Sequence, residues 1–218
     1  MTQHSIFYNG EWYSYEPQEN KVYVILHGFN GNTEILTENG FDVEEIYLKN
    51  YDKYPYEKKN PNNDWYEDNI DLNQTNLATL VDNIILPHFI KLIQNGNGPS
   101  LVITGSRGGQ ITLSRLWKFW RGNSICLNGG CNIFENKLNN INLGLITCGN
   151  DFFRTSSLDY TINKFQKKVN DLVIYHNKDD DHSVKYYNEA ILHIINKMYN
   201  YNVELELSQN AILLKIWS

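Results

Sequence analysis

Short runs of apolar and β-branched residues recur along the chain, and segments of helical period alternate with them. The strand-like runs are bounded by Gly, Asn or Asp and cover residues 21–26, 42–48, 100–104, 124–128, 143–148 and 171–175. The segments with apolar residues at helical spacing cover residues 76–94, 110–120 and 184–198. Strands that alternate with helices predict an α/β fold, in which a mostly parallel central sheet carries helices on both faces.

Details of the pattern refine this prediction at several places. In residues 76–94 the apolar face consists of Leu77, Leu80, Val81, Ile84 and Ile85, and Pro87 is expected to bend or interrupt the helix.

Residues 6–16 predict an N-terminal β-hairpin that turns at Asn9-Gly10. Trp117 and Trp120 recur at helical spacing and are expected to pack in the core. Residues 50–69 are polar, aromatic and rich in proline, which marks them as a candidate active-site loop.

Composition narrows the class of protein. A chain of 218 residues with 41% hydrophobic and 20% charged residues suits a single domain over 1–218. The balance of 19 Lys and Arg against 25 Asp and Glu leaves no basic surface for nucleic acid. Cys126, Cys131 and Cys148 form no CxxC or Cys/His cluster, so neither a disulfide framework nor a metal site is expected. Without a signal sequence or an apolar membrane span, a cytoplasmic location is expected.

The segment SLVITGSRGGQITLSRLW carries the chemistry. An apolar strand runs directly into Ser106, and an amphipathic helix follows. A serine on a sharp strand-to-helix turn needs small residues two positions before and after it, and Thr104 and Gly108 occupy these positions. The helix N-terminus also supplies oriented N–H groups, so an oxyanion beside the Arg107 amide would be stabilised.

This segment resembles the nucleophile elbow of the α/β-hydrolase family, with TGSRG in place of G-x-S-x-G. The sequence VYVILHGFNGN resembles the family's strand that ends in His-Gly, whose loop supplies a second oxyanion donor. The resemblance implies that the amides of Phe29 and Arg107 form the oxyanion hole, that Gly28 lies beside the substrate, and that His27 is structural. The family's chain order of Ser, acid and His implies a triad of Ser106, Asp151 and His182. Asp151 and His182 each follow a predicted strand, where ligands bind in open α/β sheets.

Other assignments of the triad are weaker. Asp151 has a structural interpretation as a cap or turn residue, and Asp179, Asp180 and Asp181 offer an alternative acid. That alternative would require a histidine after the next strand, and the sequence has none beyond His193. The aspartate triplet is otherwise expected to be a solvated loop.

The remaining histidines are assigned other roles. His176 lies inside a predicted strand and is expected to be structural, and His193 lies on an apolar helix face. His4 and His88 carry no functional signal. Arg107 is either a guide for an anionic substrate or a partner of an acidic loop.

Taken with the resemblance, the sequence predicts a serine hydrolase, of carboxylesterase or thioesterase type, that cleaves an ester or thioester of a small or acyl substrate through an acyl-Ser106 intermediate. The predicted hydrolase is expected to need no cofactor. Tyr54, Tyr56 and Trp65 of residues 50–69 are expected to line the substrate pocket. Two alternatives remain: a non-catalytic binding or regulatory protein of the same fold, and a nicotinamide-dependent oxidoreductase. The pair Tyr160 and Lys164 suits the oxidoreductase. The glycine spacing within the TGSRGG turn and the short distance along the chain from that turn to Tyr160 do not suit it.

Overall fold

The sheet follows the predicted alternation of strands and helices. The computed structural model describes residues 3–25, 34–45, 81–105, 113–128, 138, 140–152, 157–201 and 204–217. Seven strands form the main sheet in the order β10-β9-β8-β7-β5-β3-β4. Their bounds are β3 Lys21–Ile25, β4 Asp42–Glu45, β5 Leu101–Gly105, β7 Asn123–Leu127, β8 Asn142–Cys148, β9 Asp171–Asn177 and β10 Ala211–Trp217. All neighbouring strands are parallel except β9 and β10, so the predicted mostly parallel α/β sheet is confirmed.

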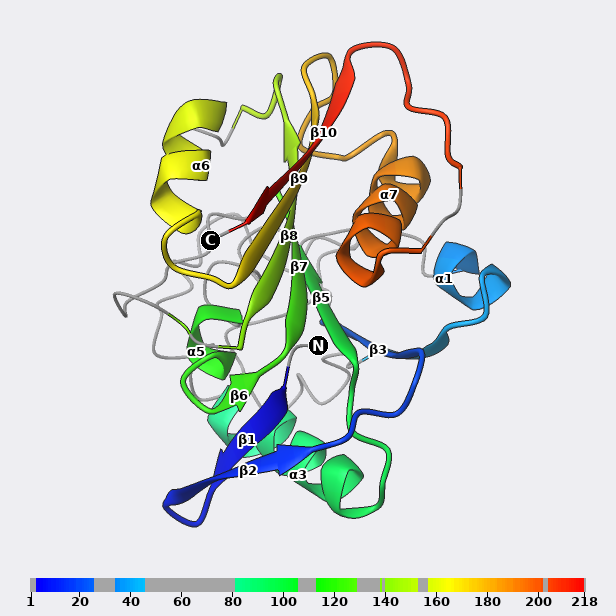
Figure 1. The fold of residues 1–218 in the computed structure, drawn as a ribbon. Helices are drawn as coiled ribbons and strands as arrows, with labels where there is room; N and C mark the ends of the chain where they lie inside the picture. The colour runs from blue at the N-terminus through cyan, green and yellow to red at the C-terminus, as the bar shows by residue number, and fades with distance from the viewer. Residues whose placement is uncertain are drawn as a thin grey trace, which may run out of the picture.

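Helices cover both faces of this sheet, as predicted. Helix α6 (Leu158–Phe165) and the short α5 (Ser114–Leu116) lie on one face, and α7 (Tyr187–Tyr199) and α1 (Glu34–Glu38) lie on the other (Figure 1). The central strands β5 and β7 are buried along their whole length. Strands covered on both sides read as unbroken apolar runs, which is why their sequences do not alternate with polar residues.

The N-terminal hairpin is confirmed. Strands β1 (His4–Tyr8) and β2 (Glu11–Tyr15) pair antiparallel, and Asn9 and Gly10 adopt φ values of 52° and 86°. These positive φ values are those of the tight turn that Asn-Gly favours. A third strand, β6 (Trp120–Arg121), joins β1 to complete a small second sheet.

The helix predicted over residues 110–120 is wrong at its C-terminal end. Helix α5 ends at Leu116, and Trp120 lies in β6, where it pairs with Ile6. The Trp120 indole donates to the Tyr15 hydroxyl at 2.8 Å, so contacts with the hairpin override the helical spacing of the sequence. Trp117 and Trp120 are both buried, as expected of core residues.

The helix predicted over residues 76–94 changes from π-helical to α-helical at Leu86, directly before Pro87, and residues 76–80 lie outside the described residues. A π-helical turn, η2 (Val81–Ile85), precedes α3 (Leu86–Gln94), and Pro87 lies in the first turn of α3. Proline is tolerated there because the first amides of a helix have no intrahelical acceptor. Val81 and Ile85 of the predicted apolar face are fully buried. The third predicted helix, 184–198, is observed as α7.

Candidate active site

Two loops meet at the carboxyl ends of neighbouring parallel strands. Strands β8 and β9 end side by side, with Cys148 opposite Asn177. Asp151 lies in the loop after β8, and His182 lies in the loop that connects β9 to α7. The carboxyl ends of parallel strands share one edge of a sheet, which is the usual place for a ligand in this class of fold.

The side chains of Asp151 and His182 are hydrogen-bonded. His182 Nδ1 lies 2.9 Å from Asp151 Oδ1. The Asp151 side chain is 2% exposed and the His182 side chain 26% exposed. An ionised carboxylate only accepts hydrogen bonds, so Nδ1 is the donor and the neutral imidazole carries no proton on Nε2. A histidine held in this tautomer is suited to accept a proton as a general base.

Main-chain contacts join the two loops. The Gly149 amide donates to the Asn177 carbonyl at 2.8 Å, and the Asn150 amide donates to the Asp180 carbonyl at 2.9 Å. Gly149 has no room for a side chain, because a Cβ would lie 2.6 Å from Lys178 Cα and closer still to the Lys178 carbonyl oxygen. The absence of a Cβ at position 149 therefore sets how closely the two loops approach.

A buried aspartate shapes the turn around His182. Asp180 is 2% exposed, and its carboxylate accepts from the amides of Asp181 and Lys185, both at 2.9 Å, and from the amide of Tyr186 at 3.2 Å. These bonds link the residues before and after His182 to one carboxylate. The expectation that the aspartate triplet is a solvated loop is therefore wrong for Asp180, because buried carboxylates persist only where hydrogen bonds satisfy them.

The same turn contains an unusual backbone conformation. Val184 has φ of 52°, in the left-handed region that β-branched residues rarely adopt. Its amide donates to the Asp181 carbonyl at 3.1 Å, and its carbonyl accepts from the Tyr187 amide at 3.0 Å. A strained residue held by its surroundings beside His182 is typical of functional loops.

Asn128, at the end of β7, supports the His182 loop from the neighbouring strand. Its side-chain amide donates to the carbonyls of Asp181 and His182, each at 3.2 Å. It also lies 3.4 Å from Cys148 Sγ. Burial raises the pKa of Cys148 to about 12, which outweighs the opposite effect of the Asn128 hydrogen bond. Cys148 is therefore protonated at neutral pH and is a poor nucleophile.

Most of the other predicted site residues lie outside the described residues. These are Ser106, Arg107, Gly28, Phe29, Tyr54, Tyr56 and Trp65, together with His27 and the segment 50–69. Strand β5 ends at Gly105, directly before Ser106 in the sequence, and β7 separates β5 from β8. Thr104, in the position of the family's first glycine, is fully buried, and its hydroxyl has no hydrogen-bond partner in the described part of the chain.

The other described histidines have structural surroundings. His176 lies in β9, with Nδ1 3.0 Å from Thr147 Oγ1. His193 is 4% exposed, stacks on Tyr175 and lies 3.0 Å from the Glu206 carbonyl. Both agree with the structural roles expected from the sequence. His88 carried no signal in the sequence, but its Nε2 lies 2.6 Å from Glu44 Oε1.

Asn128 and Gly149 were not predicted to serve the site, and Asp180 was predicted only as an alternative acid of the triad and not as a support for the His182 loop. The only signal in the sequence is their position, since each lies at or shortly after the end of a predicted strand. Their contacts cross between the loops after β7, β8 and β9, and pairing of that kind has no periodicity along the chain.

The described residues contain neither a candidate metal site nor a candidate membrane span. In these ranges, no group of three or more His, Cys, Asp and Glu side chains is arranged to hold a metal ion. Nor does any helix within them have the length and apolar character needed to cross a membrane.

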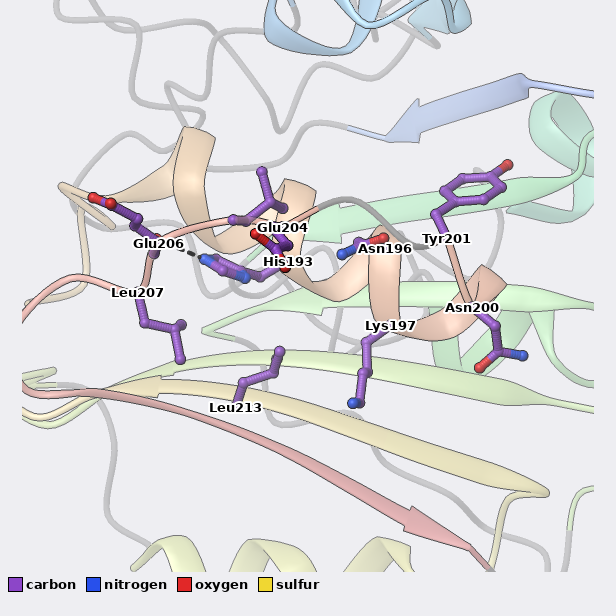
Figure 2. A pocket seen from close by; sticks show the side chains of 10 residues that line it. His193, Asn196, Lys197, Asn200, Tyr201, Glu204, Glu206, Leu207 and Leu213 are labelled. Carbon is purple, nitrogen blue, oxygen red and sulfur yellow. Dashed lines mark hydrogen bonds between the residues drawn. The ribbon is translucent and has the colours of Figure 1, made fainter.

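A pocket of about 710 Å³ lies away from Asp151 and His182. Figure 2 shows it between the C-terminal half of α7, the segment that follows this helix, and Leu213 of β10. Its charged lining residues are Lys197, Glu204 and Glu206. The α7 residues that line the pocket begin at His193, whereas the His182 loop precedes the first residue of α7, Tyr187.

No family model matches the chain, and no curated protein matches it. Among solved structures, the chain is similar to a protein from Xanthomonas campestris pv. campestris assigned to the alpha/beta superfamily of hydrolases. The match has 11% sequence identity and a TM-score of 0.49, and covers 83% of this chain and 98% of the other.

Proposed function

We propose that this protein is a serine hydrolase that cleaves an ester or thioester of a small or acyl substrate, with Ser106 as nucleophile, His182 as general base and Asp151 as the orienting acid. The observation that supports this most strongly is the bond of 2.9 Å between His182 Nδ1 and the buried Asp151 carboxylate. It lies at the sheet edge where β5 also ends, one residue before Ser106 in the sequence.

The proposed reaction has two halves. His182 Nε2 takes the proton of the Ser106 hydroxyl as the serine oxygen attacks the substrate carbonyl carbon. The negative charge that develops on the carbonyl oxygen is stabilised by the amides of Phe29 and Arg107. The tetrahedral intermediate then expels the alcohol or thiol, which receives its proton from His182, and the acyl group stays on Ser106.

In the second half, His182 takes a proton from water, and the hydroxide attacks the acyl-Ser106 carbonyl. Collapse of this intermediate releases the carboxylic acid and returns the proton to Ser106. Asp151 keeps its negative charge throughout and stabilises the imidazolium form of His182. The acyl group would contact Gly28 and the aromatic side chains of Tyr54, Tyr56 and Trp65.

Labelling with a fluorophosphonate probe tests the nucleophile. The native protein is expected to take up one label, and Ser106→Ala is expected to abolish labelling. Ser157→Ala is a matched control, because Ser157 caps the N-terminus of α6 and has no proposed role in the reaction. Labelling that persists in Ser106→Ala would remove Ser106 from the mechanism. A native protein that takes no label and turns over no ester or thioester would instead be a non-catalytic binding protein.

A further inference from the structure

The two edges of the seven-stranded sheet are built differently. Strand β4 forms one edge with only four residues, of which Asp42, Glu44 and Glu45 are acidic. Strand β10 forms the other edge with seven residues, AILLKIW, which include no proline and one charge. Short length and charge are the usual means by which proteins keep an edge strand from pairing with another chain. The β4 edge has both, whereas β10 has only Lys215 as protection.

The outer edge of β10 has no strand partner among the described residues, and the strand carries apolar side chains. In the part of the chain that the structure describes, β9 is the only strand that pairs with β10, which lies at one end of the sheet (Figure 1). Successive side chains alternate, so Ile212, Leu214 and Ile216 share one face of the sheet. Ile212 is 42% exposed, and the other two are half-buried. An edge of this kind accepts an additional antiparallel strand through main-chain hydrogen bonds.

We propose that a second copy of this chain pairs with β10, antiparallel, about a twofold axis at Leu214. The two seven-stranded sheets would then form one continuous sheet. In this register Leu214 faces Leu214 of the second copy, and Ile212 faces Ile216. Apolar side chains directly opposite each other stabilise an antiparallel pair, and here β10 satisfies that requirement against itself. A second copy is therefore the occupant that this sequence fits, through an interface in which both chains use the same surface.

The opposite face of β10 adds charge complementarity. Leu213 lies on this face and lines the pocket that Glu204 and Glu206 also line (Figure 2). The same register places Lys215 of the second copy opposite Leu213. Each Lys215 ammonium donates to the Lys197 carbonyl at 3.2 Å and to Asn200 Oδ1 at 2.8 Å in its own chain, and its positive charge would approach the carboxylates of the other chain. Exposed ion pairs contribute little energy, so this contact selects the register and adds little to the affinity.

Symmetric disulfide trapping tests the register. In Leu214→Cys the two cysteines would lie opposite each other with Cα atoms about 4.5 to 5.5 Å apart, which a disulfide can span. In the matched control Ile212→Cys, the two cysteines would lie four residues apart along the ladder, about 13 Å, which a disulfide cannot span. Mild oxidation is expected to give a covalent dimer of Leu214→Cys and none of Ile212→Cys or of the wild type. Equal crosslinking of both variants, or no crosslinking of Leu214→Cys, would overturn the proposal.

Sedimentation measures the association itself. The wild type is expected to be a dimer, and Leu214→Lys a monomer, because two like charges would face each other at the twofold axis. Tyr13→Lys, on the exposed edge strand β2, is expected to remain a dimer. A wild type that sediments as a monomer at about 100 μM, where an association with a micromolar Kd is populated, would also overturn the proposal. If Leu214→Lys does not fold, the cysteine variants still decide the outcome.

Discussion

Two histidine–carboxylate pairs in the described chain have similar geometry and different surroundings. His88 Nε2 lies 2.6 Å from Glu44 Oε1, and His182 Nδ1 lies 2.9 Å from Asp151 Oδ1. In the first pair both side chains are partly exposed, by 38% and 33%. In the second pair the carboxylate is buried and the histidine is reached by solvent. The shorter distance therefore belongs to the pair with no proposed chemical role.

The partners of Glu44 explain why its pair is structural. Its carboxylate also accepts from the Tyr23 hydroxyl at 2.7 Å and lies 3.4 Å from the Lys21 ammonium. Burial acts to raise the pKa of Glu44, but the hydrogen bonds from Tyr23 and His88 and the charges of His88 and Lys21 outweigh it and lower the pKa. The cluster joins β3, β4 and α3 at the short edge of the sheet. Its residues lie within the strands and the helix, not in the loops that follow strands.

The Asp151–His182 pair differs in its position and support. Both residues lie in loops at the carboxyl ends of parallel strands, and Gly149, Asp180 and Asn128 hold these loops to one another. A close histidine–carboxylate contact therefore does not by itself indicate catalysis. The candidate pair is distinguished by its place in the sheet and by the hydrogen bonds that hold its loops.

Removing each histidine should separate the two pairs most strongly. His182→Ala is expected to lower the turnover of p-nitrophenyl acetate or an acyl-thioester at least about a hundredfold, because triad residues act as a unit. His88→Ala is expected to change turnover by less than about twofold, since surface substitutions away from a site have small effects. Steady-state kinetics of both variants, with circular dichroism to confirm folding, provide the measurement. Equal losses of turnover would contradict the distinction drawn between the pairs.

Gly149→Ala should disturb the support of Asp151 without removing either partner. The new Cβ would collide with the backbone at Lys178, so the loop after β8 must shift relative to the loop after β9. We expect the free energy of unfolding to fall by about 2 kcal/mol, as backbone strain of this kind typically costs. We also expect turnover to fall about tenfold, since displacements of about 1 Å have effects of this order or larger.

Gly96→Ala is the matched control for this prediction. Gly96 has φ of 77°, but nothing lies within 4 Å of the position of its Cβ. It should lose about 1 kcal/mol of stability from its left-handed backbone and keep its turnover. If denaturant unfolding and kinetics showed the same profile for both variants, close approach at Gly149 would have no role in positioning Asp151.

The smallest expected effect is the pH dependence of the Glu44 cluster. The folded pKa of Glu44 is lowered from the ordinary value of 4.5, so its contribution to stability is present above that value and is lost as pH falls through the folded pKa. The stability difference between the wild type and Glu44→Gln should therefore shrink as pH falls from about 6 to about 3. Urea denaturation across this range measures it. A difference that stays constant would show that the Glu44 carboxylate is not stabilised in its charged form.

The sequence was informative about strands and loops and less so about contacts between them. The strand-like runs predicted all six parallel strands of the main sheet. The central strands β5 and β7 are the clearest of these, because strands buried on both faces must be largely apolar. They did not include β10 or β6. Strand β6 has only two residues and forms through its pairing with β1, against a helical pattern in the sequence. Strand β10 follows a stretch of mixed polarity and is identified as a strand by its partner β9.

The candidate site was also predicted only in part. The chain order of strands and the resemblance to a family motif named Asp151 and His182 as candidates, because residues that follow parallel strands share one sheet edge. The sequence alone determined the α/β alternation, the N-terminal hairpin and the loops in which candidate site residues lie, since hydrophobic period and turn chemistry are local properties. Only the tertiary structure decided that Asp151 and His182 are hydrogen-bonded, that Asp180 is buried and that β4 and β10 form unequal edges. Those features depend on which strands become neighbours, and no local pattern encodes the distance between two loops.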